Sequence, residues 1–402
     1  MVITTHFIDS EWNLHKRILN FCQVANHKGE TIGKIIESCL LKWRMDKVFS
    51  VTIDNASSND ISISYIMKRL RSWNSLVLDG EILHMKCCAH IINLIVNEVL
   101  KEMHDSISSV RNAVRYVRSS PKRLTKFKDR VEQEKIKCKA LVCLDVATPW
   151  NSTYLMLDHA LKFEKAFKVL EDEELDYVDY FKEGDHGNKR TGPPTIDDWK
   201  NVGVFVKFLK VFYDVNAKMS GSLYVTSNSY FHELWGIREL LIQWSTNVNS
   251  VLSNMSSNMK VKYEKYWGSV ERINKLIFIA VVLDPRYKLD YISFCFSNIY
   301  EDAMAKVMVD GIKNYLIRLY DYYKFYNNAQ DHNQSKSRLT SNSMSMKMDT
   351  IDEENLSGSI LVLSRYKRRR EEQHSLELKN DVDRYLSDPS EEVDDNFDVL
   401  AW

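Results

Sequence analysis

Glycine and proline are scarce, with 12 and 6 among 402 residues, which argues against an all-β protein rich in tight turns and against collagen-like classes. Net charge is absent too, because 55 lysines and arginines balance 55 acidic residues, so the whole chain predicts no charged partner. No apolar stretch reaches the roughly 18 residues of a membrane-spanning helix, and no secretory leader is evident. The seven irregularly spaced cysteines do not suit a disulfide framework. We therefore expect a reduced, intracellular protein with no membrane span.

Apolar residues are abundant, and their spacing predicts strands alternating with helices first and helices alone afterwards. A hydrophobic share of 44% can bury a sizeable core, and the length predicts roughly two to three domains. The predicted strands are 2–7, 15–21, 48–53, 82–85 and 140–146. The predicted helices are 31–43, 59–73, 89–100, a helix-rich stretch 108–129, 152–175, 197–219, 228–244, 259–282, 301–326 and one beginning at 381. Residues 327–357 are rich in small polar residues and predict a disordered linker.

Positive charge gathers in residues 111–139, which hold 11 lysines and arginines against three acidic residues. Three of these arginines recur at helical spacing and predict one basic face, which is a candidate footprint for nucleic-acid phosphates. A solvated face is the usual interpretation of such a run, but the few acids and the interleaved Tyr116 and Phe127 favour nucleic acid. The candidate DNA-binding residues are Arg111, Arg115, Arg118, Lys122, Arg123, Lys126, Lys128 and Arg130.

Asp54 follows the apolar run 48–53, and a carboxylate at the carboxyl end of a buried strand projects to where a ligand can bind. The residues around it are also good turn and helix-capping chemistry, and the pattern alone favours that structural role.

A second cluster of polar residues resembles half of a zinc site. A structural zinc ion needs four ligands, normally as two pairs, and the only candidate second pair is weak. We therefore favour a packed thiol and a hydrogen-bonded histidine at a helix start. The first pair is Cys87 and His90, with Cys88 and His84 nearby, and the weak second pair is Cys138 and Cys143.

Nine segments, in order along nearly the whole chain, resemble hAT-family transposases, and in particular the plant BED-zinc-finger group called RICESLEEPER-like. VTIDNASSND (51–60) is similar to the segment that carries the second catalytic carboxylate of that family, and HMKCCAHIINLIV (84–96) to its CxxH segment. The others are HFIDSEWNLHKRILNF (6–21), VRSSPKRLTKF (117–127), LDVATPWNSTYLML (144–157), DDWKNVGVFVKFLKVFYDV (197–215), LDPRYKL (283–289), VDRYLSDP (382–389) and FDVLAW (397–402).

The resemblance implies an α/β fold with an incomplete RNase H-like core and a large all-α insertion. It implies DNA as a partner, a nuclear location that the basic cluster 367–370 would serve, and Mg²⁺ in complete relatives. We expect the first part of the core in 1–157, the helical insertion in 158–326, a disordered basic linker in 327–375 and the start of the C-terminal dimerisation region in 376–402.

The resemblance also implies that two of three catalytic carboxylates lie outside this chain, one before residues 6–21 and one beyond 397–402. Asp54 would be the remnant of a metal site, and Asp9 matches a family aspartate that is not catalytic. Two Mg²⁺ ions about 3.5–4 Å apart need several carboxylates, so we expect DNA binding without catalysis and no cofactor. The BED finger and most of the dimerisation region are missing as well, so we expect homodimerisation to be impaired.

Trp150 matches a family tryptophan placed near the processed DNA end, where an indole can stack on an extruded base. Pro149 stands where the family usually has arginine, and a core tryptophan is an equally weighted interpretation. Two other functions stay open. One is a helical protein-interaction module without DNA binding, and the other is a transposase whose missing carboxylates come from a partner chain.

Overall fold

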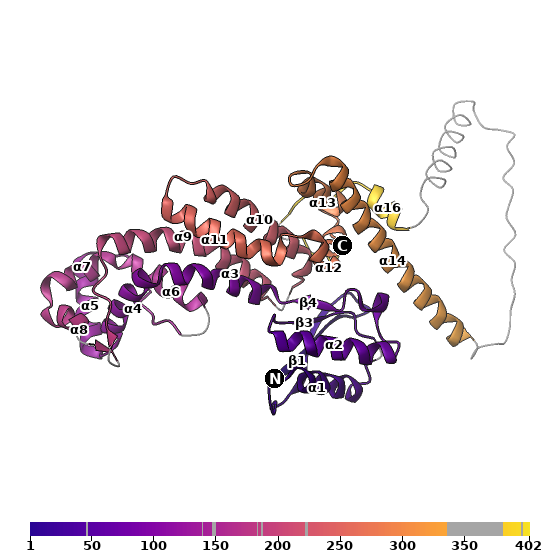
Figure 1. Cartoon of the computed structure of the whole chain (residues 1–402), viewed down its shortest axis with the longest axis horizontal. Coiled ribbons are helices and arrows are strands. Elements are labelled where there is room, and N and C mark those ends of the chain that lie inside the picture. Colours follow the sequence, from indigo (N-terminus) through magenta and orange to yellow (C-terminus); the bar gives the residue numbers. More distant parts are fainter. Residues whose placement is uncertain are drawn as a thin grey trace, which may run out of the picture. The chain divides into compact units, whose positions relative to one another are not determined.

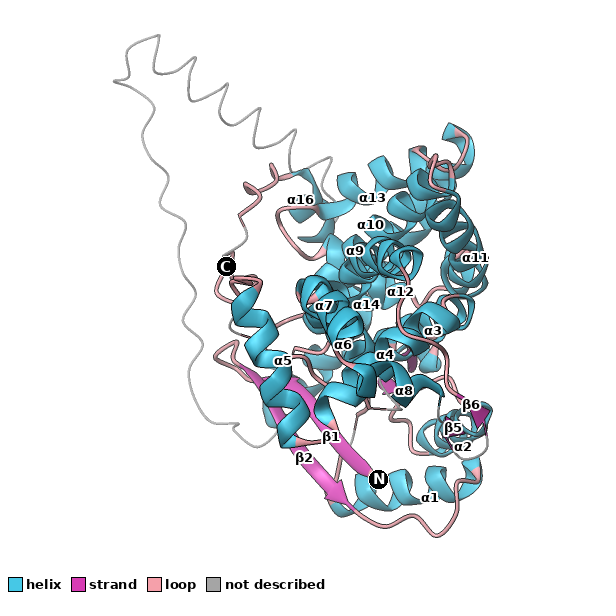
Figure 2. Cartoon of the chain, turned by 90° about the vertical axis from the view of Figure 1, so that its left-hand side faces the viewer, coloured by secondary structure: helices cyan, strands magenta, loops and turns pink. Residues whose placement is uncertain are grey.

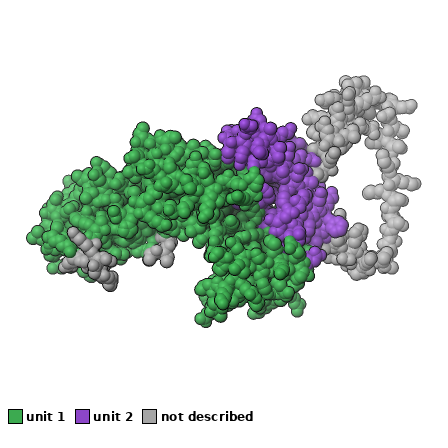
Figure 3. All heavy atoms as spheres, viewed as in Figure 1, with its two compact units in different colours: residues 1–73, 83–274 green, residues 74–82, 275–402 purple. Residues whose placement is uncertain are grey.

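The computed structural model of the chain describes residues 1–45, 47–138, 140–146, 150–182, 184–185, 188–221, 224–335, 381–394 and 397–402. They divide into two compact units, which are residues 1–73 with 83–274 and residues 74–82 with 275–402 (Figure 3). Helices dominate, and the strands of the described residues pair only two by two (Figure 2).

The first unit begins with an antiparallel hairpin of β1 (Val2–Ile8) and β2 (Leu14–Phe21), where the sequence predicted two strands (Figure 2). Asp9 closes its turn, because one carboxylate oxygen accepts hydrogen bonds from the backbone N–H groups of Glu11 and Asn13 at 3.0 and 2.9 Å. Its other oxygen lies 2.7 Å from Nε2 of His15. Asp9 therefore has a structural role within the hairpin.

Helices α1 (Gly29–Lys42) and α2 (Ser57–Ser72) pack closely because glycine lies at their contact. A Cβ atom on Gly29 would lie 2.1 Å from the carbonyl oxygen of Ser58, and one on Gly33 would lie 2.8 Å from the ring of Tyr65. Only a residue without a Cβ fits such an approach.

Strands β3 (Val51–Ile53) and β4 (His84–Lys86) pair in parallel, and α3 (Cys88–Glu102) begins directly after β4. The carboxyl ends of both strands therefore meet at one edge. Helix α3 is apolar on much of its surface because it packs against helices α9 and α11 of the same unit. The bounds of these and the other elements of the first unit are α4 (His104–Arg118), α5 (Pro121–Gln133), α6 (Trp150–Lys162), α7 (Glu164–Glu173), α8 (Leu175–Lys182), β5 (Gly184–Asp185), β6 (Asn188–Lys189), α9 (Ile196–Met219), α10 (Ser227–Ser245), α11 (Ser250–Trp267) and the 3₁₀ turn η2 (Val270–Arg272).

The second unit is a helical cluster in which α14 packs against the other elements. Lys288 holds its C-terminal segment, because Nζ donates to the carbonyl oxygens of Tyr385 and Asp388, each at 2.8 Å. The elements are η1 (Val77–Gly80), α12 (Lys275–Val282), α13 (Lys288–Ser297), α14 (Asp302–Ser335) and α16 (Asp381–Ser387).

Three element predictions were wrong. Residues 140–146 form no strand: Val142 is buried, whereas Leu141, Leu144 and Val146 are exposed, and Asp145 is instead tied to Arg111 of α4 and to Thr153 of α6. The helix predicted at 152–175 is divided into α6, α7 and α8, and the one at 259–282 into α11, η2 and α12, because apolar spacing continues across the breaks. Helix α14 also continues to Ser335, which lies within the predicted linker. The rest of that linker, and the basic cluster 367–370, lie outside the described residues.

Candidate functional site

Asp54 lies at the carboxyl edge of the parallel pair, beside the first turn of α3. The backbone N–H of Cys87 donates to the carbonyl oxygen of Ile53 at 3.0 Å, which brings the two segments together. The sequence predicted this position for Asp54, since the carboxylate follows a strand end. The residue is exposed to solvent.

The carboxylate of Asp54 is engaged in the start of α2. Its Oδ1 accepts from the backbone N–H of Ala56 at 2.9 Å and from Nδ2 of Asn59 at 2.6 Å. This is the turn chemistry that the local sequence favoured. Asn55, which the sequence did not single out, has both side-chain polar atoms buried without a hydrogen-bond partner in the described part of the chain.

The residues around Asp54 do not fit a pair of divalent cations. Among the residues that the structure describes, no group of three or more histidine, cysteine, aspartate or glutamate side chains could hold a metal ion. Two Mg²⁺ ions need several oxygen ligands from carboxylates, and one aspartate supplies too few.

The cysteine and histidine residues near α3 sit in a packed environment. Burial raises the pKa of the Cys88 thiol to about 12, so it stays protonated at neutral pH. Burial also lowers the pKa of His84. Cys87 precedes α3 and His90 lies in its first turn. No zinc cluster forms from them within the described chain, and Cys143 has a separate partner, the Nδ1 atom of His159 at 3.5 Å.

Four of the predicted DNA-binding cations are exposed. Helix α4 leaves Arg115 and Arg118 exposed and Arg111 partly exposed, away from its buried residues, and the role of this face stays a prediction. Within the part of the chain that the structure describes, these four side chains form no ion pair, so their charges face solvent. They are Arg115, Arg118, Lys122 and Lys128.

Three other cations pair with carboxylates of the same unit, so their charges are not free in this structure, and their contact with DNA stays a prediction. Nη2 of Arg111 lies 2.8 Å from Oδ2 of Asp145, and the carboxylate is nearly buried. Nζ of Lys126 lies 2.6 Å from Oε2 of Glu174, and this hydrogen bond raises the pKa of Lys126. Arg130 pairs with the glutamates at 173 and 174, at 2.8 and 3.7 Å.

Trp150 begins α6 with a side chain that is only 4% exposed. An indole stacks on a base only when a face is accessible, so this conformation does not present Trp150 to DNA, and the core interpretation matches its environment. The prediction that concerned Pro149 lies outside the described residues.

Three family models match successive parts of the chain. Residues 1–82 match the ZBED1 RNase-like domain, residues 85–208 the ZBED1 RNase-like helical domain, and residues 228–323 the hAT-like transposase RNase-H fold. The chain is therefore similar to hAT-like transposases, whose RNase-H fold matches residues 228–323. The predicted combination of an RNase H-like core with helical domains is confirmed.

The relatives include BED-zinc-finger proteins and transposases of plants. The chain is 35% identical to zinc finger BED domain-containing protein RICESLEEPER 2 of Oryza sativa subsp. japonica, over 75% of this chain and 40% of that protein. It is 30% identical to the putative AC transposase of Zea mays, over 100% of this chain and 47% of that protein. The chain thus spans less than half the length of these relatives. No helix of the described residues combines the length and apolar character that a membrane crossing requires.

Proposed function

We propose that residues 1–402 bind duplex DNA in the nucleus through the basic surface of α4 and α5, and that they do not cleave it. The observation that carries the proposal is the set of four exposed cations that make no ion pair with any described residue, Arg115, Arg118, Lys122 and Lys128. Free guanidinium and ammonium groups replace the counterions of DNA phosphates. A relative that is named as a transposase supports DNA as the partner.

The absence of cleavage is supported by the geometry at Asp54. Its Oδ1 already accepts two hydrogen bonds from the start of α2, and the described residues bring no group of three acidic, histidine or cysteine side chains together. Phosphodiester cleavage by two metal ions requires carboxylates that hold both.

The salt dependence of binding to a short duplex tests the proposal. Contact between four cations and phosphates predicts a slope of log K against log[salt] of about −4 or steeper. Arg115→Gln with Arg118→Gln should make the slope shallower by about two. Fluorescence anisotropy over about 50 to 200 mM salt measures this.

A matched control is Lys207→Gln with Arg272→Gln, which removes the same charge from exposed positions on α9 and η2. The control should bind like the parent chain. Equal losses in both double variants would contradict a local interface on α4.

The alternative is a protein-interaction module without DNA binding. The ion pairs of Arg111, Lys126 and Arg130 favour it, because they reduce the free positive charge of the surface. Absence of binding at micromolar protein and low salt would favour this alternative.

A further inference from the structure

Helix α4 packs against α5 and α8 (Figure 1). Two arginines and two tyrosines stack on one another near these helices. The guanidinium carbon of Arg123 lies 4.2 Å from the ring centroid of Tyr116 and 5.8 Å from that of Tyr180. The guanidinium carbon of Arg190 lies 3.9 Å from the Tyr180 ring. The two tyrosine rings are 5.3 Å apart, edge to face. Arg190 thus joins the basic helices from a segment far along the chain.

Neither arginine has a carboxylate partner among the described residues. Nη1 of Arg190 donates to the carbonyl oxygen of Tyr180 at 2.8 Å, and Nη1 of Arg123 donates to Oγ of Ser119 at 2.7 Å. Nε of Arg190 is buried and has no hydrogen-bond partner among the residues that the structure describes. A buried donor without a partner costs free energy, so a structure normally supplies one. An anion would satisfy it.

The described acids near the cluster pair with other cations or act on Tyr116. Glu174 pairs with Lys126 and Arg130, and Asp179 pairs with Lys182 at 2.7 Å. Burial, and after it the negative charge of Asp176 in the first turn of α8, raises the pKa of Tyr116. Both guanidinium groups lie near the Tyr180 ring, at 5.8 and 3.9 Å from its centroid, so negative charge near that ring would be attracted to both of them. Arginine stacked on an aromatic ring is held in place while its planar fork stays available for a phosphate.

We propose that Arg123 and Arg190, held on the rings of Tyr116 and Tyr180, form a clamp for a backbone phosphate of DNA. This clamp rests on the proposed function, because it extends the surface of Arg115, Arg118 and Lys122. It adds a residue from outside the basic stretch and predicts that bound DNA passes from α4 over α5 to Arg190.

The purely structural alternative is that Arg190 only caps α8, since its bond to Tyr180 lies at the C-terminal end of that helix. Two substitutions separate the roles. Arg190→Gln removes the charge, and Arg190→Lys keeps the charge while it loses the fork and the stacking.

Anisotropy titrations with the same short duplex over about 50 to 200 mM salt test the clamp. Arg123→Gln and Arg190→Gln should each make the slope shallower by about one, and each should weaken low-salt affinity by about tenfold. Arg190→Lys should keep the parent slope with weaker affinity. The control Arg272→Gln should leave both quantities unchanged.

Parent-like affinity and slope in Arg190→Gln would overturn the clamp while the proposed function stands. Equal losses in Arg190→Gln and Arg190→Lys, with an unchanged slope, would reduce Arg190 to a helix cap and also overturn it. Failure of the parent chain to bind DNA would reject the proposed function itself, and the clamp with it.

Discussion

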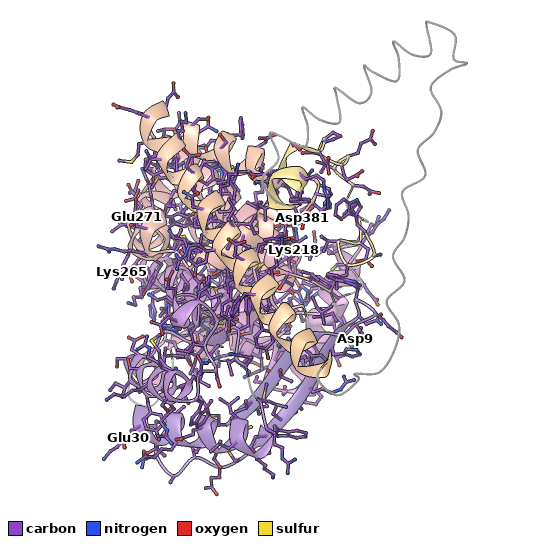
Figure 4. All side chains as sticks on the ribbon, turned by 90° about the vertical axis from the view of Figure 1, so that its right-hand side faces the viewer. Asp9, Glu30, Lys218, Lys265, Glu271 and Asp381 are labelled. Atoms are coloured by element: carbon purple, nitrogen blue, oxygen red, sulfur yellow. The ribbon has the colours of Figure 1, made fainter. Side chains whose placement is uncertain are left out.

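At the scale of single residues, hydrogen bonds to ionised side chains stabilise local structure in this chain. Asp9 is an example, because hydrogen bonds from His15 and from the backbone of Asn13 lower the pKa of its carboxyl group to about 2 (Figure 4). The ionised form therefore contributes to hairpin stability above the unfolded pKa of about 3.9, and this contribution is lost as the pH falls toward 2.

A carboxyl-carbon NMR titration should place the Asp9 transition near pH 2, with a parallel shift in the amide signals of β1 and β2. Asp9→Asn should abolish the acid transition of those amides. A midpoint near pH 4, with hairpin signals that do not change, would contradict the hydrogen-bonded assignment.

The buried pair of Asp284 and Arg286 in the second unit predicts a large loss of stability. Asp284 is fully buried and accepts from Nε of Arg286 at 3.0 Å and from Nη2 at 2.8 Å. Asp284→Ala leaves a guanidinium without its counter-charge and should cost about 3–5 kcal/mol in urea unfolding. Glu30→Ala, which removes an exposed partner of Lys34 on α1, is the control and should change little. Equal effects of the two substitutions would argue against the buried pair.

At the scale of elements, the contact of α1 with α2 depends on Gly29. An added methyl group would meet the backbone oxygen of Ser58 at 2.1 Å, so one helix must move. Gly29→Ala should destabilise the first unit by about 1–3 kcal/mol in urea unfolding. Gly236→Ala, in α10 with open space around the new methyl group, should be neutral or stabilising by up to about 1 kcal/mol. The reverse order of stabilities would contradict this packing.

Periodicity predicted most elements, because an amphipathic helix such as α1 or α2 carries its burial pattern locally. It failed at 140–146, where only Val142 of the apolar run is buried and the run makes no sheet. It also missed the helix ends near Phe163 and Gly268, since apolar residues continue at helical spacing on both sides.

For the candidate site, the sequence predicted which cations lie on an exposed helix face but not which of them form ion pairs. Spacing alone placed Arg115 and Arg118 on an exposed face of α4. The partner of Arg111 lies 34 residues away and the partner of Lys126 lies 48 residues away, so only tertiary packing determines which cations are neutralised. The clamp residue Arg190 was missed for this reason, because it reaches the basic helices through the tyrosines of α4 and α8.

At the scale of the whole molecule, zero net charge conceals a local positive surface on α4 and α5. The compact units group residues 1–73 with 83–274, and the family models change between residues 82 and 85. The division at residues 157, 326 and 375 stays a prediction. Since the chain spans less than half of its relatives, the functional proposal concerns residues 1–402 alone.

The most direct test of DNA binding without cleavage is electrophoresis of supercoiled plasmid incubated with the chain and Mg²⁺. We predict that plasmid migration is retarded at low salt and that, after the protein is removed, the DNA is still supercoiled. Nicked circles that depend on Mg²⁺ and disappear with Asp54→Ala would contradict the account.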